Sequence, residues 1–261
     1  EAFIKTYEET LAMVKEVEQL TINPADYAYE ITKRGKRDDS VVNHRIYRQK
    51  QEGLYYVEYH PVGGDANVKH LLAALDYAVT LDQVEARIAP DQSLYFINLT
   101  ADEARKIADL TDDSAINEFR RSVSCVGSTV CQIGIQDSNG LLKAIFTHLE
   151  AKGVDTRKLP RLHISGCPHS CGTHQIGEIG FHGSVKLVDK KPTTSFMLVD
   201  GGSEHMGSEN FSKMAGHIVA TKIPEFMETL ANKLNEAPEP DFGTWRLTHK
   251  GEYMELIKAF E

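Results

Sequence analysis

Apolar residues near the start of the chain recur at the spacing of an amphipathic helix. This pattern covers residues 2–20, and residues 24–33, which begin with a proline and end before Gly35, predict a second short helix. A charged segment, 36–39, then separates these helices from the first predicted strand. We therefore expect residues 1–45 to form a helical linker or extension.

A regular succession of strand and helix patterns occupies residues 46–112. The first strand is rich in aromatic and β-branched residues, and Asp65 can cap the helix after it. The predicted elements are strands at 53–60, 83–89 and 94–99 and helices at 66–80 and 101–110. Their order, β-α-β-β-α, predicts a ferredoxin-like antiparallel sheet with helices on one face, forming a half-domain over residues 46–112.

The remaining residues, 113–261, mix helical and strand patterns. The predicted elements are a helix that runs up to Cys125, helices at 138–152, 223–234 and 252–260, and strands at 161–165, 176–188 and 195–199. This order predicts a second, mixed α/β domain and makes the fold class of the chain α+β.

Charge and composition narrow the function. The 261 residues carry a net charge of −9, which argues against binding to the phosphate backbone of nucleic acids. No apolar run is long enough to cross a bilayer and no signal peptide is recognisable, so a cytoplasmic protein is expected. The first residue is Glu1 rather than Met, which indicates a piece of a longer protein.

The four cysteines of the chain form two spaced pairs. Cys125 and Cys131 are separated by five residues, and Cys167 and Cys171 by three. Four cysteines are too few for a disulfide scaffold of this size, so metal ligation or catalysis is the better interpretation. Two loops can bring four thiolates together from different directions, as an iron–sulfur cluster requires.

Two other interpretations of the cysteines are open. Zinc is held by four cysteines in many structural sites, although these sites typically have two to four residues between paired ligands, and a spacing of five is less usual. Cysteines without a ligand behave as small apolar residues, but these four lie beside glycine, proline or serine rather than on apolar helix faces. The pairing therefore favours a metal or cluster site.

The cysteine motifs resemble the signature of the nitrite and sulfite reductase hemoprotein family. The first is Cys125-Val-Gly-Ser-Thr-Val-Cys131, and the second is Gly166-Cys167-Pro-His-Ser-Cys171-Gly172. Three glycine-containing segments add to the resemblance, namely 61–65, 177–183 and 199–202. The resemblance spans roughly residues 53–202 and covers the second of two related modules in full-length members of the family.

This resemblance implies the cofactors and the reaction. In the family the four cysteines bind a [4Fe–4S] cluster, and the last of them, here Cys171, also coordinates the iron of siroheme and so belongs to the catalytic centre. Nitrite or sulfite would be reduced by six electrons to ammonia or sulfide. The electron donor would be ferredoxin or a flavoprotein.

Polar residues outside the motifs are candidates for holding the eight carboxylates of siroheme. The segment from Arg87 to Ser93 resembles the Arg-x-Thr-x-x-Gln-Asn segment of the family, which makes Arg87 and Gln92 cofactor-binding candidates. Ala89 and Ser93 replace its Thr and Asn. Further basic residues close to the cysteine motifs are Arg120, Arg121, His163, His169 and His174.

The resemblance also implies a missing part. Several basic residues that hold the substrate anion belong to the first module of the family, which this chain lacks, so the N-terminal half of the same protein is an expected partner. Isolated, the chain is expected to be an inactive fragment or a small single-module enzyme. Two alternatives remain at this stage, a non-catalytic iron–sulfur electron-transfer domain and a zinc-stabilised structural domain.

Overall fold

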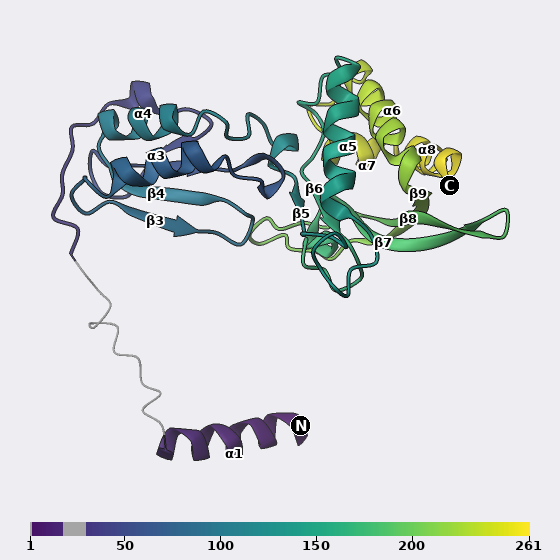
Figure 1. The fold of residues 1–261 in the computed structure, drawn as a ribbon, viewed down its shortest axis with the longest axis horizontal. Helices are drawn as coiled ribbons and strands as arrows, with labels where there is room; N and C mark the ends of the chain where they lie inside the picture. The colour runs from purple at the N-terminus through teal and green to yellow at the C-terminus, as the bar shows by residue number, and fades with distance from the viewer. Residues whose placement is uncertain (1, 18–29) are drawn as a thin grey trace. The chain divides into compact units, whose positions relative to one another are not determined.

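The computed structural model describes residues 2–17 and 30–261 and divides the chain into two compact units, residues 1–33 and 34–261 (Figure 1). In the first unit, α1 (Ala2–Val17) confirms the first predicted helix as far as the described residues extend. The second predicted helix, at 24–33, lies mostly on residues 18–29, outside the described residues, and residues 30–33 are not helical. The division of the chain into three domains remains a prediction.

The first sheet of the second unit is antiparallel and has the strand order β1-β2-β4-β3. Its strands are β1 (Ile46–Arg48), β2 (Tyr55–Tyr59), β3 (Glu85–Ile88) and β4 (Leu94–Leu99). The helices α3 (Val68–Ala78) and α4 (Ala101–Leu110) cover one face (Figure 1). This arrangement confirms the predicted fold of residues 46–112, and the short edge strand β1 is an addition to it.

The start of α3 differs from the prediction. The helix is capped by Asn67, whose side chain accepts a hydrogen bond from the Lys69 backbone N–H at 3.1 Å. Asp65 instead forms an ion pair with Lys143 Nζ at 2.9 Å. Asparagine and aspartate cap helices about equally well, so the position of the preceding turn decides between them.

The second sheet is mixed and has the order β5-β6-β7-β8-β9. Its strands are β5 (Val123–Ser124), β6 (Leu162–Ser165), β7 (Ile179–Val188), β8 (Lys191–Asp200) and β9 (Lys213–Val219). The first three are parallel and the last two antiparallel. Its helices are α5 (Ser138–Ala151), α6 (Ile223–Glu236), α7 (Phe242–Thr248) and α8 (Lys250–Phe260).

The helix predicted to run up to Cys125 is wrong. A single 3-10 turn, Phe119–Arg121, is followed by the two-residue strand β5. Extended pairing with β6 satisfies the backbone of this segment, because Val123 lies opposite His163 and Ser124 opposite Ile164. Strand β9 and helix α7 are also absent from the prediction.

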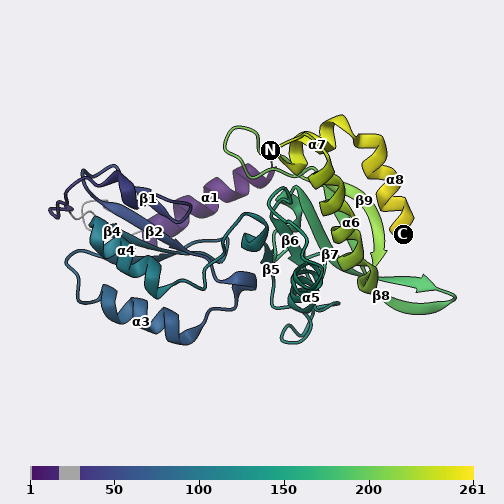
Figure 2. The same cartoon turned by 90° about the horizontal axis from the view of Figure 1, so that it is seen from above.

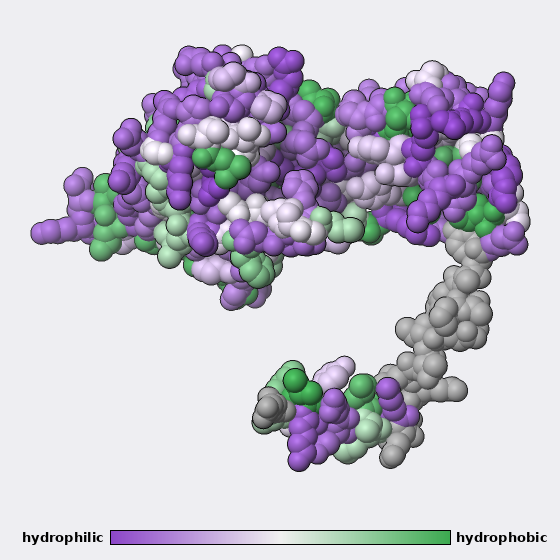
Figure 3. Space-filling view, turned by 180° about the vertical axis from the view of Figure 1, so that it is seen from behind, coloured by the Kyte–Doolittle hydropathy of each residue, from purple (hydrophilic) through white to green (hydrophobic). Residues whose placement is uncertain are grey.

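Apolar side chains from α5 and α6 fill the larger core against the second sheet. Leu142, Ile145 and Phe226 from the helices and Phe181 and Leu198 from the sheet are fully buried. Figure 2 shows α6 and α8 beside this sheet, with α5 seen end-on near β6 and β7. Seen from behind, the surface is mostly hydrophilic and its hydrophobic residues form small separate areas (Figure 3). None of the helices among the described residues is long and apolar enough to span a membrane.

Candidate functional site: two cysteine loops at one edge of the second sheet

Two neighbouring parallel strands deliver the cysteine loops. Strand β5 ends directly before Cys125, and β6 ends one residue, Gly166, before Cys167. Parallel strands end at the same edge of a sheet, and the loops at their carboxyl ends form the usual ligand site of such sheets. The local sequence therefore places both cysteine pairs at one edge although 41 positions separate Cys125 from Gly166.

Backbone hydrogen bonds join the two loops. The Cys125 N–H donates to the Ile164 carbonyl at 3.0 Å, and the N–H groups of Ile135 and Gln136 both donate to the Gly166 carbonyl, at 3.1 and 2.8 Å. Cys131 lies inside the loop that these bonds close, and its own N–H donates to the Gly127 carbonyl at 2.8 Å. The first loop is therefore folded onto the second largely by main-chain contacts.

Close backbone packing explains two glycines of the motifs. A Cβ atom on Gly166 would lie 2.5 Å from the Gln136 carbonyl oxygen, and one on Gly183 of β7 would lie 2.1 Å from the Gly166 carbonyl oxygen. Real Cβ contacts are not this short, so any larger residue would push the loops apart. The third parallel strand thus supports the second cysteine loop from behind.

The second loop turns sharply around Cys171. Ser170 and Thr173 have left-handed backbone angles, with φ of 62° and 52°, and the Thr173 N–H donates to the Ser170 carbonyl at 2.8 Å. The Gly172 N–H donates to Ser165 Oγ, at the end of β6, at 3.0 Å. These contacts hold Cys171 at the surface, and it is the exposed member of the cysteine set, whereas Cys167 is buried.

The arrangement of sulfur atoms bears on the choice of metal. All four cysteines are free of disulfides. A zinc ion holds sulfur at about 2.3 Å in a tetrahedron, which places ligand sulfurs about 3.8 Å apart. Among the described residues, no three cysteine sulfurs lie within 4.8 Å of one another. An iron–sulfur cluster places different demands on its ligands, because each thiolate binds a different iron.

The two cofactor candidates from the first sheet lie differently. Gln92 Nε2 donates to the Ser124 carbonyl at 2.7 Å, directly beside Cys125, and its Oε1 atom is buried without a partner. Arg87 lies on the edge strand β3, with its side chain 60% exposed and paired with Glu85 at 2.9 Å. The structure thus places Gln92 against the first cysteine loop and Arg87 on the open surface.

The other basic candidates have structural contacts of their own. Arg120 pairs with Glu150 and lies over the Phe146 ring at 4.6 Å. His163 is buried, and its Nδ1 lies 2.8 Å from Thr173 Oγ1, while His169 is exposed on the second loop. Burial, followed by repulsion from neighbouring histidines, lowers the pKa of His174 to about 4. His174 therefore adds no positive charge beside the second loop at neutral pH.

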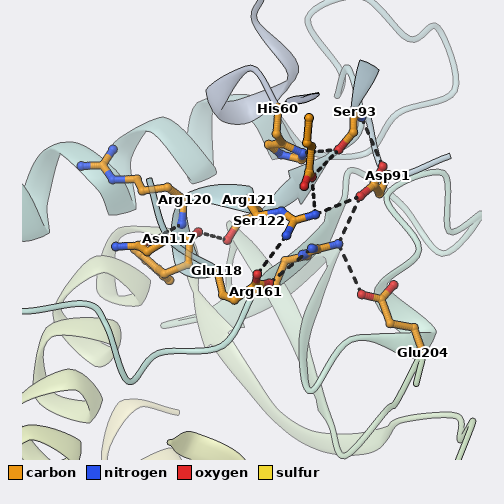
Figure 4. Close-up of polar contacts among 12 residues, drawn as sticks. His60, Asp91, Ser93, Asn117, Glu118, Arg120, Arg121, Ser122, Arg161 and Glu204 are labelled. Carbon is orange, nitrogen blue, oxygen red and sulfur yellow. Dashed lines mark hydrogen bonds and ion pairs between the residues drawn. The ribbon is translucent and has the colours of Figure 1, made fainter. Parts of the chain in front are cut away.

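Arg121 belongs instead to a partly buried ionic network that the sequence analysis did not predict (Figure 4). It pairs with Glu58 of β2, and it lies 3.0 Å from Glu118 and 3.8 Å from Asp91. Arg161 adjoins it, 3.5 Å from Asp91 and 3.3 Å from Glu118 and Glu204. We call the six residues the junction network, because they link β2 and the turn between β3 and β4 to the segments that precede β5 and β6: Glu58, Asp91, Glu118, Arg121, Arg161 and Glu204.

A buried histidine lies at the edge of the junction network. His60 is 1% exposed, its Nδ1 lies 2.9 Å from Ser93 Oγ, and its Nε2 has no partner. Ser93 also donates to Glu58 at 3.2 Å, which ties the histidine to the charged residues. Burial lowers the pKa of His60 to about 4, so its ring is neutral at pH 7.

Comparison with known proteins supports one fold class. No protein-family model matches the chain. In structure it is similar to the NirA protein of Mycobacterium tuberculosis, with a TM-score of 0.62 and 20% identity over 79% of this chain and 40% of the other. It is also similar to dissimilatory sulfite reductase I, with a TM-score of 0.54 and 8% identity over 78% and 69% of the two chains. The fold is therefore that of the α+β nitrite and sulfite reductases.

Relatives that are similar in sequence are also nitrite and sulfite reductases. The chain is 26% identical to a ferredoxin–nitrite reductase of Synechococcus elongatus over 193 residues, 71% of this chain and 37% of that protein. It is 28% identical to the sulfite reductase [NADPH] hemoprotein beta-component of Lysinibacillus sphaericus over 124 residues, 43% of this chain and 22% of that protein. The chain is thus similar in sequence to nitrite and sulfite reductases, and it spans about a third of the length of the nitrite reductase that it matches.

Proposed function

We propose that this chain is the part of a nitrite or sulfite reductase that holds a [4Fe–4S] cluster and siroheme. The observation that carries the proposal is the meeting of two hydrogen-bonded cysteine loops at the carboxyl ends of β5 and β6. Similarity to the reductases named above supports reading this donor set as more than a chance group of thiols.

The residues present fit an iron–sulfur cluster. Four free thiols are offered by two loops, and thiolates are the usual ligands of such clusters. The glycine at position 166 lets the two loops approach, since a Cβ there would lie 2.5 Å from the Gln136 carbonyl oxygen.

We assign different roles to the cysteines. Cys125, Cys131 and Cys167 would bind the cluster alone, and Cys171 would bind both the cluster and the siroheme iron. The exposure of Cys171 supports this division, because a sulfur shared between two centres needs free space on a second side. Soft, electron-rich thiolate suits iron in both centres.

Two side chains would meet the macrocycle. Gln92 is fixed beside Cys125, and its Nε2 would have to leave the Ser124 carbonyl to donate to a siroheme carboxylate, which only accepts hydrogen bonds. Arg87 would have to leave Glu85 to pair with a siroheme carboxylate, which its exposed position permits. His174 would remain neutral and would add no positive charge beside the second loop.

When bound, these cofactors supply electrons one at a time to an iron at which nitrite is reduced to ammonia or sulfite to sulfide. The names of the relatives favour nitrite as substrate and ferredoxin as donor, with a flavoprotein as the alternative donor. The basic residues that hold the anion would come largely from the rest of the protein, since the chain spans only part of its relatives.

Anaerobic reconstitution with iron, sulfide and siroheme tests the proposal. We expect four irons per chain, broad visible absorption from thiolate-to-iron charge transfer, and a siroheme spectrum that shifts when nitrite, sulfite or cyanide is added. A colourless protein that holds one zinc would overturn the proposal. A cluster without siroheme would overturn the siroheme assignment and leave an electron-transfer domain.

A further inference from the structure

The Cys125 sulfur differs from the other three in its surroundings. It lies 3.1 Å from the Gly166 backbone N–H, which donates to it, and 3.0 Å from the hydroxyl oxygen of Ser138. Among the described residues, Cys125 is the cysteine whose sulfur has hydrogen-bond partners. The two contacts come from different segments, the second cysteine loop and the first turn of α5.

The Ser138 hydroxyl is held in place by its position in the fold. Ser138 is the first residue of α5 and is fully buried. The preceding residue, Asp137, caps the helix by accepting a hydrogen bond from the Gly140 N–H at 2.9 Å. A buried side chain at a capped helix start has little freedom, so its hydroxyl remains beside Cys125.

The state of Cys125 decides where the Ser138 proton points. The hydroxyl oxygen lies 2.9 Å from the Cys125 carbonyl oxygen as well as 3.0 Å from the sulfur. A thiol can donate its own proton to the hydroxyl, which leaves the hydroxyl free to donate to the carbonyl. A thiolate can only accept, so ligation of Cys125 makes its sulfur compete for the hydroxyl proton.

We propose that Ser138 tunes the reduction potential of the cluster by donating a hydrogen bond to the Cys125 thiolate. The inference rests on the proposed function, because it concerns the cluster assigned there. Reduction adds negative charge that is shared by the cluster sulfurs, and a hydrogen-bond donor stabilises this more negative state more strongly. Ser138 is therefore a positioning residue that raises the potential.

The test compares three reconstituted chains by iron content and by redox titration followed with electron paramagnetic resonance. Ser138→Ala is expected to keep four irons and to raise the ratio of oxidised to reduced cluster at a fixed potential about tenfold, which corresponds to a fall of about 59 mV for a one-electron couple. Ser138→Thr, which keeps the hydroxyl, is expected to restore the wild-type potential. Ser195→Ala removes a buried serine of β8 that contacts His217 and is expected to change nothing.

The outcomes separate this inference from the proposed function. A wild-type chain that binds no cluster would overturn the proposed function itself. Four irons with an unchanged potential in Ser138→Ala would overturn the tuning role alone. If Ser138→Ala binds no cluster, the test uses the wild-type chain in D₂O. Exchange is expected to shift the Fe–S(Cys) stretching bands in its resonance Raman spectra. Unshifted bands would overturn the proposal.

Discussion

The cysteine loops and the junction network are both polar regions, but they are built in opposite ways. Main-chain hydrogen bonds and close glycine contacts hold the loops, and ionic side chains take little part. The junction network is made of two arginines and four carboxylates, with Glu58 5% and Arg121 18% exposed. The difference teaches that the loops offer a place for a bound group, whereas the carboxylates of the junction network are already paired with its two arginines.

Removing one thiol should abolish cluster binding by the cysteine loops, and this is the largest effect that we expect. We expect Cys171→Ser to disrupt the cluster and any coupling to siroheme, because serine oxygen is a poor substitute for a soft thiolate. Iron content and the visible spectrum of the reconstituted chain measure this. Arg120→Ala is the control, since Arg120 contacts Glu150 and Phe146 rather than the loops. Four irons retained in the Cys171 variant would contradict the bridging role.

Removing one charge from the junction network should lower the free energy of unfolding without preventing cluster binding at the cysteine loops. Arg121→Met leaves Glu58 buried without its cation, and breaking a buried pair in this way costs about 4 kcal/mol of unfolding free energy. Denaturant titration of the chain measures the loss. Arg157→Met is the matched control, because Arg157 is 81% exposed in its pair with Asp155 and such surface pairs contribute less than about 1 kcal/mol. Equal effects of the two substitutions would show that the junction network is not a stabilising unit.

Acidification should destabilise the chain in part through His60, which lies at the edge of the junction network. His60 has an ordinary pKa of 6.5 when unfolded and about 4 when folded, because of its burial. Between these values the unfolded chain binds more protons, so the free energy of unfolding is unaffected by His60 above pH 6.5 and falls as the pH drops towards 4. The loss from this group is about 3 kcal/mol, at about 1.4 kcal/mol per pKa unit.

Unfolding curves from pH 7 to pH 4 check this dependence. We expect His60→Gln to flatten the loss of stability in this window, because glutamine does not titrate. His44→Gln, at an exposed position, should keep the wild-type slope. A His60 variant as pH-sensitive as the wild type would rule out His60 as the source.

The two regions also differ in how far sequence can predict them. The cysteines are visible because each pair is close in sequence and the pairs follow two short strands. The junction network brings together residues from separate segments, such as Glu58 and Arg121, which lie 63 positions apart. Each looks like ordinary surface charge on its own, so only the packing of the sheets reveals the network.

Individual helices and strands also differ in how well the sequence predicts them. Helices such as α5 and α6 are amphipathic over four turns or nearly so, and they match the prediction closely. Strand β5 has two residues, and its extended form depends on pairing with β6, which no local pattern records. The local sequence also does not decide which residue caps α3. Asp65 and Asn67 are both suitable capping residues, and only the preceding turn selects Asn67.

The smallest expected effect tests whether glycine packing defines the cysteine loops. In Gly183→Ala the new methyl group would approach the Gly166 carbonyl oxygen, and overpacking of this kind costs about 2 kcal/mol. Because Gly166 precedes Cys167, we expect the second loop to shift and the reconstituted iron content to fall, while Arg121 keeps its ion pairs. Gly251→Ala, in α8 with no atom near the added methyl, should leave both stability and iron content unchanged or slightly improved. Full iron loading in a destabilised Gly183 variant would mean that the loops tolerate displacement and that thiol spacing alone builds the site.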